Sequence, residues 1–219
     1  MRPLPRLLAM ADARIAARDD LGIRAAAIAA VGPTVALVAR LPGGSGEALT
    51  ALAVRFVALA LPPMASVLVT GRADIARASG AHGVIARASD LPLADLRRIT
   101  GGPDYLHLRS VHSLAEAEAA VAEEADALIV GTIWESASHP GRPGVGLGLI
   151  EATARLGCPV YAIGGVTSAR AREARDAGAW GVAAIGAVWD AKDSYEAVSG
   201  LVEGRIDDRS SMIDGFVPG

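Results

Sequence analysis

The chain has 219 residues, enough for one α/β domain with a full core, and its formal net charge of −3 argues against a nucleic-acid or membrane-surface partner. Hydrophobic residues make up 52% of the chain and aromatic residues only 4%, which suits helices packed on a buried parallel sheet. One cysteine, Cys158, excludes an internal disulfide and a thiolate metal cluster, and one lysine, Lys192, leaves little scope for Schiff-base chemistry.

Eight short apolar runs, each bounded by turn residues, predict buried strands. In chain order they are 6–10, 34–39, 66–69, 83–86, 105–108, 127–130, 160–163 and 182–185. Segments with helical periodicity alternate with these runs. They lie at 20–31, 47–60, 72–79, 90–99, 113–124, 147–156 and 194–202, with a further helix between Thr167 as its N-cap and Gly178. Ser113 and Glu116 have the spacing of a capping box, which fixes the start of one of these helices.

Eight strand-then-helix units of this length predict an α/β fold, a single (β/α)8 TIM barrel over residues 1–203. A doubly wound open sheet is the alternative, but it carries a glycine fingerprint after its first strand, and residues 11–13 are Ala-Asp-Ala. Residues 204–219 are expected to form a polar C-terminal tail. The N-terminal segment has no apolar run long enough for a signal peptide or a membrane span, so we expect a cytoplasmic protein without membrane contact.

The seventh and eighth predicted strands are each followed at once by glycine. Gly164 and Gly165 follow the seventh, and Gly186 follows the eighth, between Ile185 and Ala187. Glycine lets backbone N–H groups come close to a ligand, and the loops after strands seven and eight of such barrels often hold a phosphate. We therefore predict that these five residues bind phosphate. Ordinary tight turns of a parallel sheet are the alternative.

The loop 131–146 is the longest connection in the chain, and long loops inside compact domains tend to be functional. Ser136 and Ser138 can donate hydrogen bonds to an anionic ligand, and Glu135 and His139 can move protons near neutral pH. A solvated surface loop is the alternative interpretation.

Further polar residues follow other predicted strands and are expected at the same end of the barrel. They are Asp12, Arg40, Thr70, Asp90, Arg109, Ser110 and His112. We expect His112 to be a structural hydrogen-bonding residue and Asp90 to cap the helix that it begins. No cluster of His, Cys and carboxylates has metal-ligand spacing, which argues against a bound zinc ion, whereas a magnesium ion on a phosphate needs only one or two carboxylates.

Two segments carry a family resemblance: SVHSLAEAEAAVAEEADALIVGTIWES at 110–136 and PVYAIGGVTSARAREARDAGAWGVAAIGAVW at 159–189. They resemble the thiamine phosphate synthase and thiazole tautomerase (TenI-like) family, and the similarity extends over about residues 66–189. The resemblance implies a thiamine-biosynthesis barrel that binds a small phosphorylated thiazole or pyrimidine, with the phosphate on the two glycine turns. Because family members often pair, it also implies a homodimer.

The synthase branch joins the thiazole to a pyrimidine diphosphate with the help of magnesium. The resemblance places its first magnesium aspartate at Gly71, where no carboxylate is present, and its second at Asp90. The hydroxyls of its sixth loop fall at Ser136 and Ser138, and its second-strand basic pair is reduced to Arg40.

The tautomerase branch moves a double bond with acid–base groups and no metal. The SVHS stretch, Gly71 and Glu135 resemble this branch, although its catalytic histidine falls at Thr132. His139, seven residues further on, can take its place if the loop folds inward.

We therefore expect a tautomerase-type isomerase without a cofactor. A divergent thiamine phosphate synthase, with Mg²⁺ at Asp90, is the first alternative, and a non-catalytic paralogue that binds a thiamine precursor is the second. The predicted catalytic residues are Thr132, Glu135 and His139, and the predicted substrate contacts are Arg40, Thr70, Ser110, Ser136 and Ser138.

Overall fold

The computed structural model describes residues 3–60, 65–102, 104–136, 141 and 143–202. The predicted tail at 204–219 lies outside the described residues, and so do Ser138 and His139.

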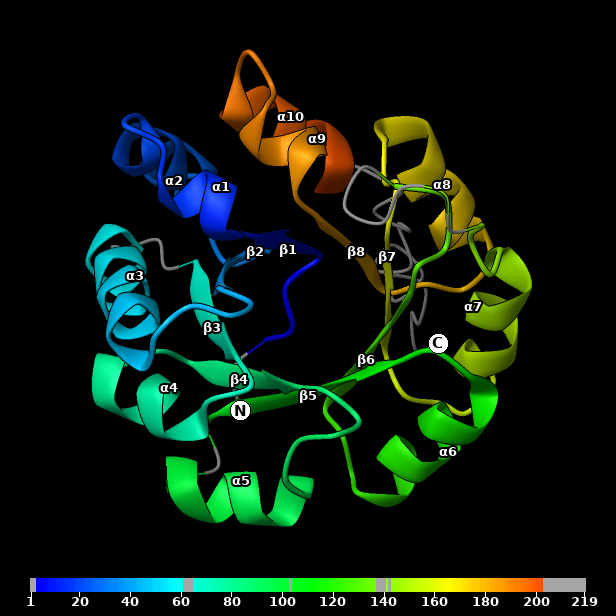
Figure 1. Ribbon diagram of the computed structural model, residues 1–219. Helices are drawn as coiled ribbons and strands as arrows, with labels where there is room; N and C mark the ends of the chain where they lie inside the picture. The colour runs from blue at the N-terminus through cyan, green and yellow to red at the C-terminus, as the bar shows by residue number, and fades with distance from the viewer. Residues whose placement is uncertain (1–2, 61–64, 103, 137–140, 142, 203–219) are drawn as a thin grey trace, which may run out of the picture.

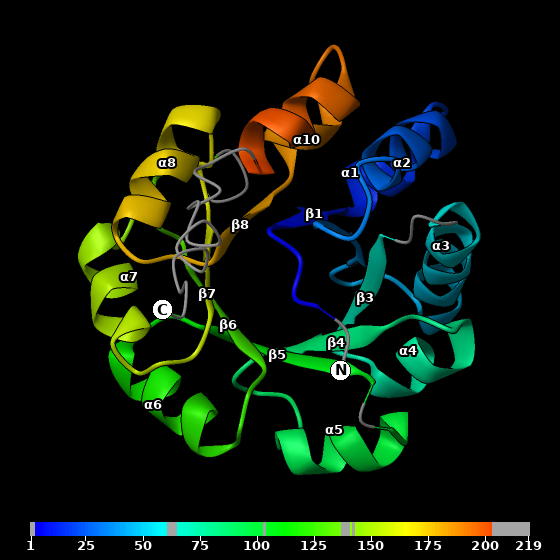
Figure 2. The same cartoon turned by 180° about the vertical axis from the view of Figure 1, so that it is seen from behind.

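Eight parallel strands pair in chain order, and β8 pairs with β1 to close the barrel. The strands are β1 Leu7–Met10, β2 Val35–Ala39, β3 Ser66–Thr70, β4 Gly83–Ala86, β5 Leu106–Val111, β6 Ala127–Gly131, β7 Val160–Ile163 and β8 Gly181–Ala184. Helices surround the strands (Figures 1 and 2), so the predicted (β/α)8 barrel is confirmed.

The longer helices match the predicted periodic segments. They are α2 Leu21–Ala29, α3 Gly46–Leu59, α4 Ala73–Ser79, α5 Leu93–Thr100, α6 Leu114–Ala122, α7 Leu147–Ala154, α8 Ser168–Asp176 and α10 Ser194–Val202. The predicted N-caps are confirmed at two of them. The Ser113 hydroxyl accepts the Glu116 N–H, and the Thr167 hydroxyl accepts the Arg170 N–H.

Two short helices were not predicted, and one predicted cap was wrong. Helix α1, Ala13–Ala16, forms because the Asp12 carboxylate accepts the Ile15 N–H at 2.9 Å. Helix α9, Gly186–Trp189, has Ile185 as its N-cap, so the eighth strand ends at Ala184. Asp90 does not cap α5, because that helix begins at Leu93 after Pro92.

Strict alternation along the closed strands divides the core into two parts. One apolar cluster fills the inside of the barrel and includes Met10, Val38, Leu68, Ile85 and Leu108. The other part consists of two clusters that lie between the strands and the helices. Because side chains at i and i+2 share a face, the residue two positions after the last interior residue of a strand lies at the carboxyl-end mouth of the barrel. This parity brings Arg40, Thr70, Arg87 and Ser110 to the site, whereas Asp12, two residues after Met10, does not line it.

The amino end of the barrel is closed by contacts from the chain that precedes β1. The buried Tyr161 hydroxyl donates to the Pro5 carbonyl at 2.5 Å, and the Trp180 indole N–H donates to the same oxygen at 2.9 Å. The Arg6 guanidinium lies 3.7 Å from the centre of the Trp180 ring. Burial raises the pKa of Tyr161, so its hydroxyl stays protonated as the donor.

Within the described part of the chain, no helix combines the length and the apolar character needed to cross a membrane.

We predict that Gly83→Ala destabilises the barrel. A Cβ at this position would lie 2.4 Å from the Leu106 carbonyl oxygen and 2.8 Å from Leu68 Cδ2, both in the barrel interior. Overpacking of this kind lowers the free energy of unfolding by roughly 1–3 kcal/mol. Urea denaturation measures the change, with Gly102→Ala as the control because a Cβ there meets nothing within 4 Å. Equal stability of the two variants would contradict the prediction.

Candidate active site

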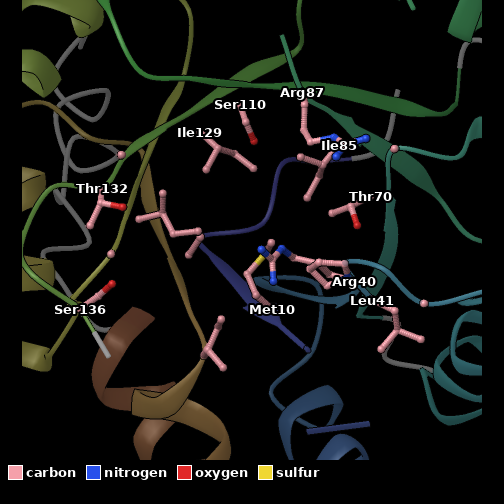
Figure 3. Close-up of a pocket in the computed structure, with 18 of the residues that line it drawn as sticks. Met10, Arg40, Leu41, Thr70, Ile85, Arg87, Ser110, Ile129, Thr132 and Ser136 are labelled. Atoms are coloured by element: carbon pink, nitrogen blue, oxygen red, sulfur yellow. The ribbon is translucent and has the colours of Figure 1, made fainter. Parts of the chain in front are cut away.

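A cavity of about 680 Å³ opens at the carboxyl ends of the strands, and residues from all eight strands or the loops that follow them line it. Its floor is apolar, formed by the side chains of Met10, Ile85, Ile129, Ile163 and Ala183. Polar groups stand above this floor on two sides. Figure 3 shows Arg40, Thr70 and Arg87 on one side of the cavity and Thr132 and Ser136 on the other. The location matches the end at which β/α barrels carry their active sites.

The turns after β7 and β8 form a cradle of backbone donors. Gly164 and Gly165 adopt φ values of +99° and +65°, which glycine tolerates best. Among the described residues, the N–H groups of Gly165, Gly186 and Ala187 have no backbone hydrogen-bond acceptor. The last two belong to the first turn of α9, where N–H groups point away from the helix and favour an anion. The five residues predicted to bind phosphate therefore come together at one side of the cavity.

The glycines of this cradle also have a packing role. A Cβ at Gly164 would lie 2.3 Å from Thr132 Cγ2, and a Cβ at Gly165 would lie 2.5 Å from the Glu135 carbonyl oxygen. The loop after β6 is fastened to the β7 turn at this place, because the Ile133 N–H donates to the Ile163 carbonyl at 2.8 Å. The glycines thus allow a tight contact and also leave N–H groups without a backbone acceptor among the described residues, and phosphate binding at these turns stays a prediction.

Three predicted site residues on the β6 loop have different positions. Thr132 and Ser136 line the cavity, and the Ser136 hydroxyl is buried without a hydrogen-bond partner among the described residues. A buried hydroxyl without a partner is uncommon, so this group is available to a ligand. Glu135 is exposed and is not among the cavity-lining residues; its carboxylate accepts the Gly141 N–H at 3.3 Å. The structure therefore gives Glu135 no contact with the cavity.

His112 lines the cavity, at the end of the barrel where the sequence placed it. It stands four residues after the interior residue Leu108 and two after Ser110, so strand parity indicates its direction. Its Nδ1 is hydrogen-bonded to the carbonyl of Gly131, as a structural role requires. Because a carbonyl only accepts, Nδ1 carries the hydrogen and a neutral ring keeps Nε2 as an acceptor. Within the described residues Nε2 has no partner, so it can accept a proton from a ligand.

Arg40 extends into the cavity from the end of β2 (Figure 3). It lies two residues after the interior residue Val38, so the alternation along the strand directs its side chain into the barrel. No hydrogen bond or ion pair holds its guanidinium within the described part of the chain. Burial holds the pKa of Arg40 below its ordinary value, Asp12 acts in the opposite direction, and Arg87 adds to the lowering. This is a half-buried cation without a contacting counter-ion.

Arg87 is a second cavity-lining cation that the sequence analysis missed. Its position two residues after the interior residue Ile85 is the signal that could have identified it. Its Nη2 donates to Asp90 Oδ1 at 2.9 Å, and its backbone N–H donates to Asp90 Oδ2 at 2.8 Å. The bond to Asp90 raises the pKa of Arg87. Asp90 itself is not among the residues that line the cavity.

The loop that carries Arg87 is supported from outside the barrel by Arg109. This buried residue donates to the carbonyls of Arg87 at 2.7 Å and Leu91 at 3.3 Å, and it forms an ion pair with Glu123. Arg109 does not line the cavity, and neither does Asp12, which caps α1. The remaining predicted contacts, Thr70 and Ser110, do line it.

Comparison with known proteins is consistent with this geometry. The family described as thiamine monophosphate synthase matches residues 7–188. The thiamine-phosphate synthase of Mycolicibacterium gilvum (strain PYR-GCK) is 41% identical over 147 residues, which cover 65% of this chain and 61% of that protein. The enzyme of the same name from Mycolicibacterium vanbaalenii is 43% identical over 135 residues, 61% of this chain and 60% of that protein. The chain therefore spans about six tenths of the length of these relatives.

Among solved structures, the thiamine phosphate pyrophosphorylase from Pyrococcus furiosus superposes with a TM-score of 0.73 at 26% identity. The superposition covers 91% of this chain and 97% of that one.

We predict that Gly165→Ala weakens phosphate binding at the cradle. An added methyl group would collide with the Glu135 carbonyl oxygen and would require a left-handed backbone that alanine disfavours. Loss of one charge-assisted hydrogen bond corresponds to roughly a tenfold weaker dissociation constant. An NMR titration with inorganic phosphate measures it, with Gly148→Ala as control because a Cβ there meets nothing within 4 Å. Unchanged binding by a folded Gly165→Ala variant would place the phosphate elsewhere.

Proposed function

The chain belongs to the thiamine monophosphate synthase family, and we propose that its cavity joins a phosphorylated thiazole to a pyrimidine diphosphate. The observation that carries this proposal is that one cavity has two separate anion-binding sides. Backbone donors stand at Gly165 and Gly186, and guanidinium groups stand at Arg40 and Arg87. A reaction between a monophosphate and a diphosphate needs two such places. The names of the similar proteins support the same reaction.

In this proposal the thiazole phosphate lies on the cradle and accepts hydrogen bonds from its backbone N–H groups, with the Ser136 hydroxyl close by. The apolar floor of Met10, Ile85 and Ile129 receives the two heterocycles. The thiazole nitrogen forms a C–N bond to the methylene carbon of the pyrimidine as the C–O bond to the diphosphate breaks. The diphosphate leaves with the electron pair, and its charge develops beside Arg40 and Arg87.

Magnesium, which the resemblance implies for this reaction, does not fit the residues present. The position of one expected carboxylate is Gly71, and Asp90 is already bonded through both oxygens to Arg87. We therefore assign no step to a metal.

Tautomerase-type isomerisation, the main prediction from the sequence, is the second candidate, and the geometry of His112 favours it. Its Nε2 is unpartnered among the described residues, and a base at this edge of the cavity could remove and return the proton that such a shift requires. Thr132 lines the same cavity but cannot act as a base near neutral pH without activation. The relatives' names favour synthesis over this alternative.

A cytoplasmic location and pairing into a homodimer, both expected from the sequence, also belong to this proposal. Sedimentation analysis of the purified chain would test the pairing.

The proposed function is tested by mixing the chain with thiazole phosphate and pyrimidine diphosphate and measuring thiamine phosphate and released diphosphate by chromatography. We expect both products in equal amounts. Isomerisation of a carboxylated thiazole phosphate in the absence of coupling would support the second candidate. Binding of the thiazole phosphate without any turnover would overturn both and indicate a non-catalytic paralogue.

We predict that His112→Gln separates the two candidates. A glutamine amide can keep the hydrogen bond to Gly131 but cannot exchange a proton. If the chain couples its substrates, kcat falls much less than the roughly 10²-fold loss that follows removal of a general base. A loss of that size in isomerisation, with an unchanged melting temperature, would instead identify His112 as the base of a tautomerase.

A further inference from the structure

We propose that Arg40 and Arg87 form an anion subsite that binds a diphosphate group without a divalent metal ion. The identity of the anion rests on the proposed function, whereas the subsite itself follows from the geometry. Both side chains line the cavity on the same side, from the ends of β2 and β4, and lie across it from Thr132 and Ser136 (Figure 3).

The first support is the charge balance at this side of the cavity. Arg40 is half-buried and makes no hydrogen bond or ion pair within the described residues. Arg87 is close enough for its charge to lower the pKa of Arg40 further. Asp90 contacts Arg87 alone, and Asp12 acts on Arg40 only at a distance, so Arg40 has no contacting carboxylate among the described residues. An anion bound beside both guanidinium groups would lower the repulsion between them. The third arginine at the rim, Arg72, is neutralised by Asp74.

The second support is the way in which Arg87 is held. Asp90 accepts hydrogen bonds from the side chain and the backbone N–H of Arg87. Arg109 donates to the Arg87 carbonyl oxygen at 2.7 Å. The Arg87 side chain is nevertheless 72% exposed, so its remaining N–H groups are open to a ligand. A guanidinium presents several donors in a planar fork that suits phosphate oxygens. The contacts of the loop therefore hold the Arg87 guanidinium in place and leave some of its N–H groups open to a ligand.

The third support is the space around Gly71. A Cβ at this glycine would lie 3.4 Å from Asp90 Oδ2 and 3.7 Å from Arg87 Nη2. A carboxylate at position 71 would thus stand close to Asp90, and the Arg87 guanidinium already lies beside both positions. Arg87 provides the positive charge at the place where a metal ion between two carboxylates would provide it. A metal bound to Asp90 would first have to displace this ion pair.

The test is calorimetric titration of the full chain with inorganic diphosphate, first in EDTA and then as its magnesium complex. We expect binding in EDTA and no tightening with magnesium. Arg40→Met and Arg87→Met should each weaken binding by about tenfold, the loss typical of a charged hydrogen bond. Arg87→Lys, which keeps the charge but loses the fork, should recover part of the loss.

Arg98→Met is the matched control. Arg98 also pairs with a carboxylate three residues away, Asp95, and is similarly exposed at 78%, but it lies on α5 outside the cavity. Its substitution removes the same charge and should change diphosphate affinity by less than about twofold, since distant exposed charges are screened. Equal weakening in Arg87→Met and Arg98→Met would overturn the subsite, because it would reflect net charge alone.

Binding of diphosphate only in the presence of magnesium would also overturn the subsite, even if coupling were observed. Metal-free binding that depends on Arg40 and Arg87 would support it, even if no thiamine phosphate formed. Failure of the subsite and failure of the proposed function can therefore be distinguished.

Discussion

The alternation of side chains along a closed set of parallel strands is the constraint on which the site depends. Once the β8–β1 pairing closes the barrel, the face of each residue is fixed by its parity along its strand. Leu68, Ile85 and Leu108 fill the interior, and two residues later Thr70, Arg87 and Ser110 stand at the mouth. A shift of one residue would bury a guanidinium among the helices. The same rule that packs the core therefore also presents the polar groups.

The fold was accessible from the sequence because each strand is a short apolar run and each helix has its own boundary signals. The cradle was accessible too, since glycine directly after the last two strands is typical of phosphate-binding turns in such barrels. Arg87 was missed because residue type alone does not show the direction of a side chain. His112 was expected at this end of the barrel only as a structural residue, because β5 continues to Val111 beyond the apolar run from which the strand was predicted. Helix α9 was missed because its four residues, from Gly186, are too short for a periodic pattern. Asp90 was assigned as a cap because a carboxylate before a helix usually is one, whereas here it binds an arginine instead.

Under the proposed function, the two sides of the cavity would bind anions by different physical means. The cradle uses partial charges of backbone N–H groups, which cannot be titrated and whose position depends on tight contacts between Gly165 and the β6 loop. The opposite side uses full charges on flexible side chains, with one of them half-buried at Arg40. Backbone donors give shape and fixed geometry, and guanidinium groups give long-range attraction. In that proposal, the cavity would distinguish its two ligands by where each charge is placed rather than by the apolar floor that they share.

The support of the Arg87 loop by Arg109 and Asp90 has an evolutionary consequence. Arg109 donates to backbone carbonyls, and Asp90 accepts the Arg87 backbone N–H as well as its side chain, so part of this support does not depend on the side chain at position 87. Gly71 has φ of +71°, a conformation that glycine, asparagine and aspartate adopt most readily. If the proposed metal-free subsite holds, substitutions at positions 71 and 87 would alter the cation requirement of the barrel without disturbing its core. Under that proposal, metal dependence would be decided by a few residues at the mouth of the barrel and not by the fold itself.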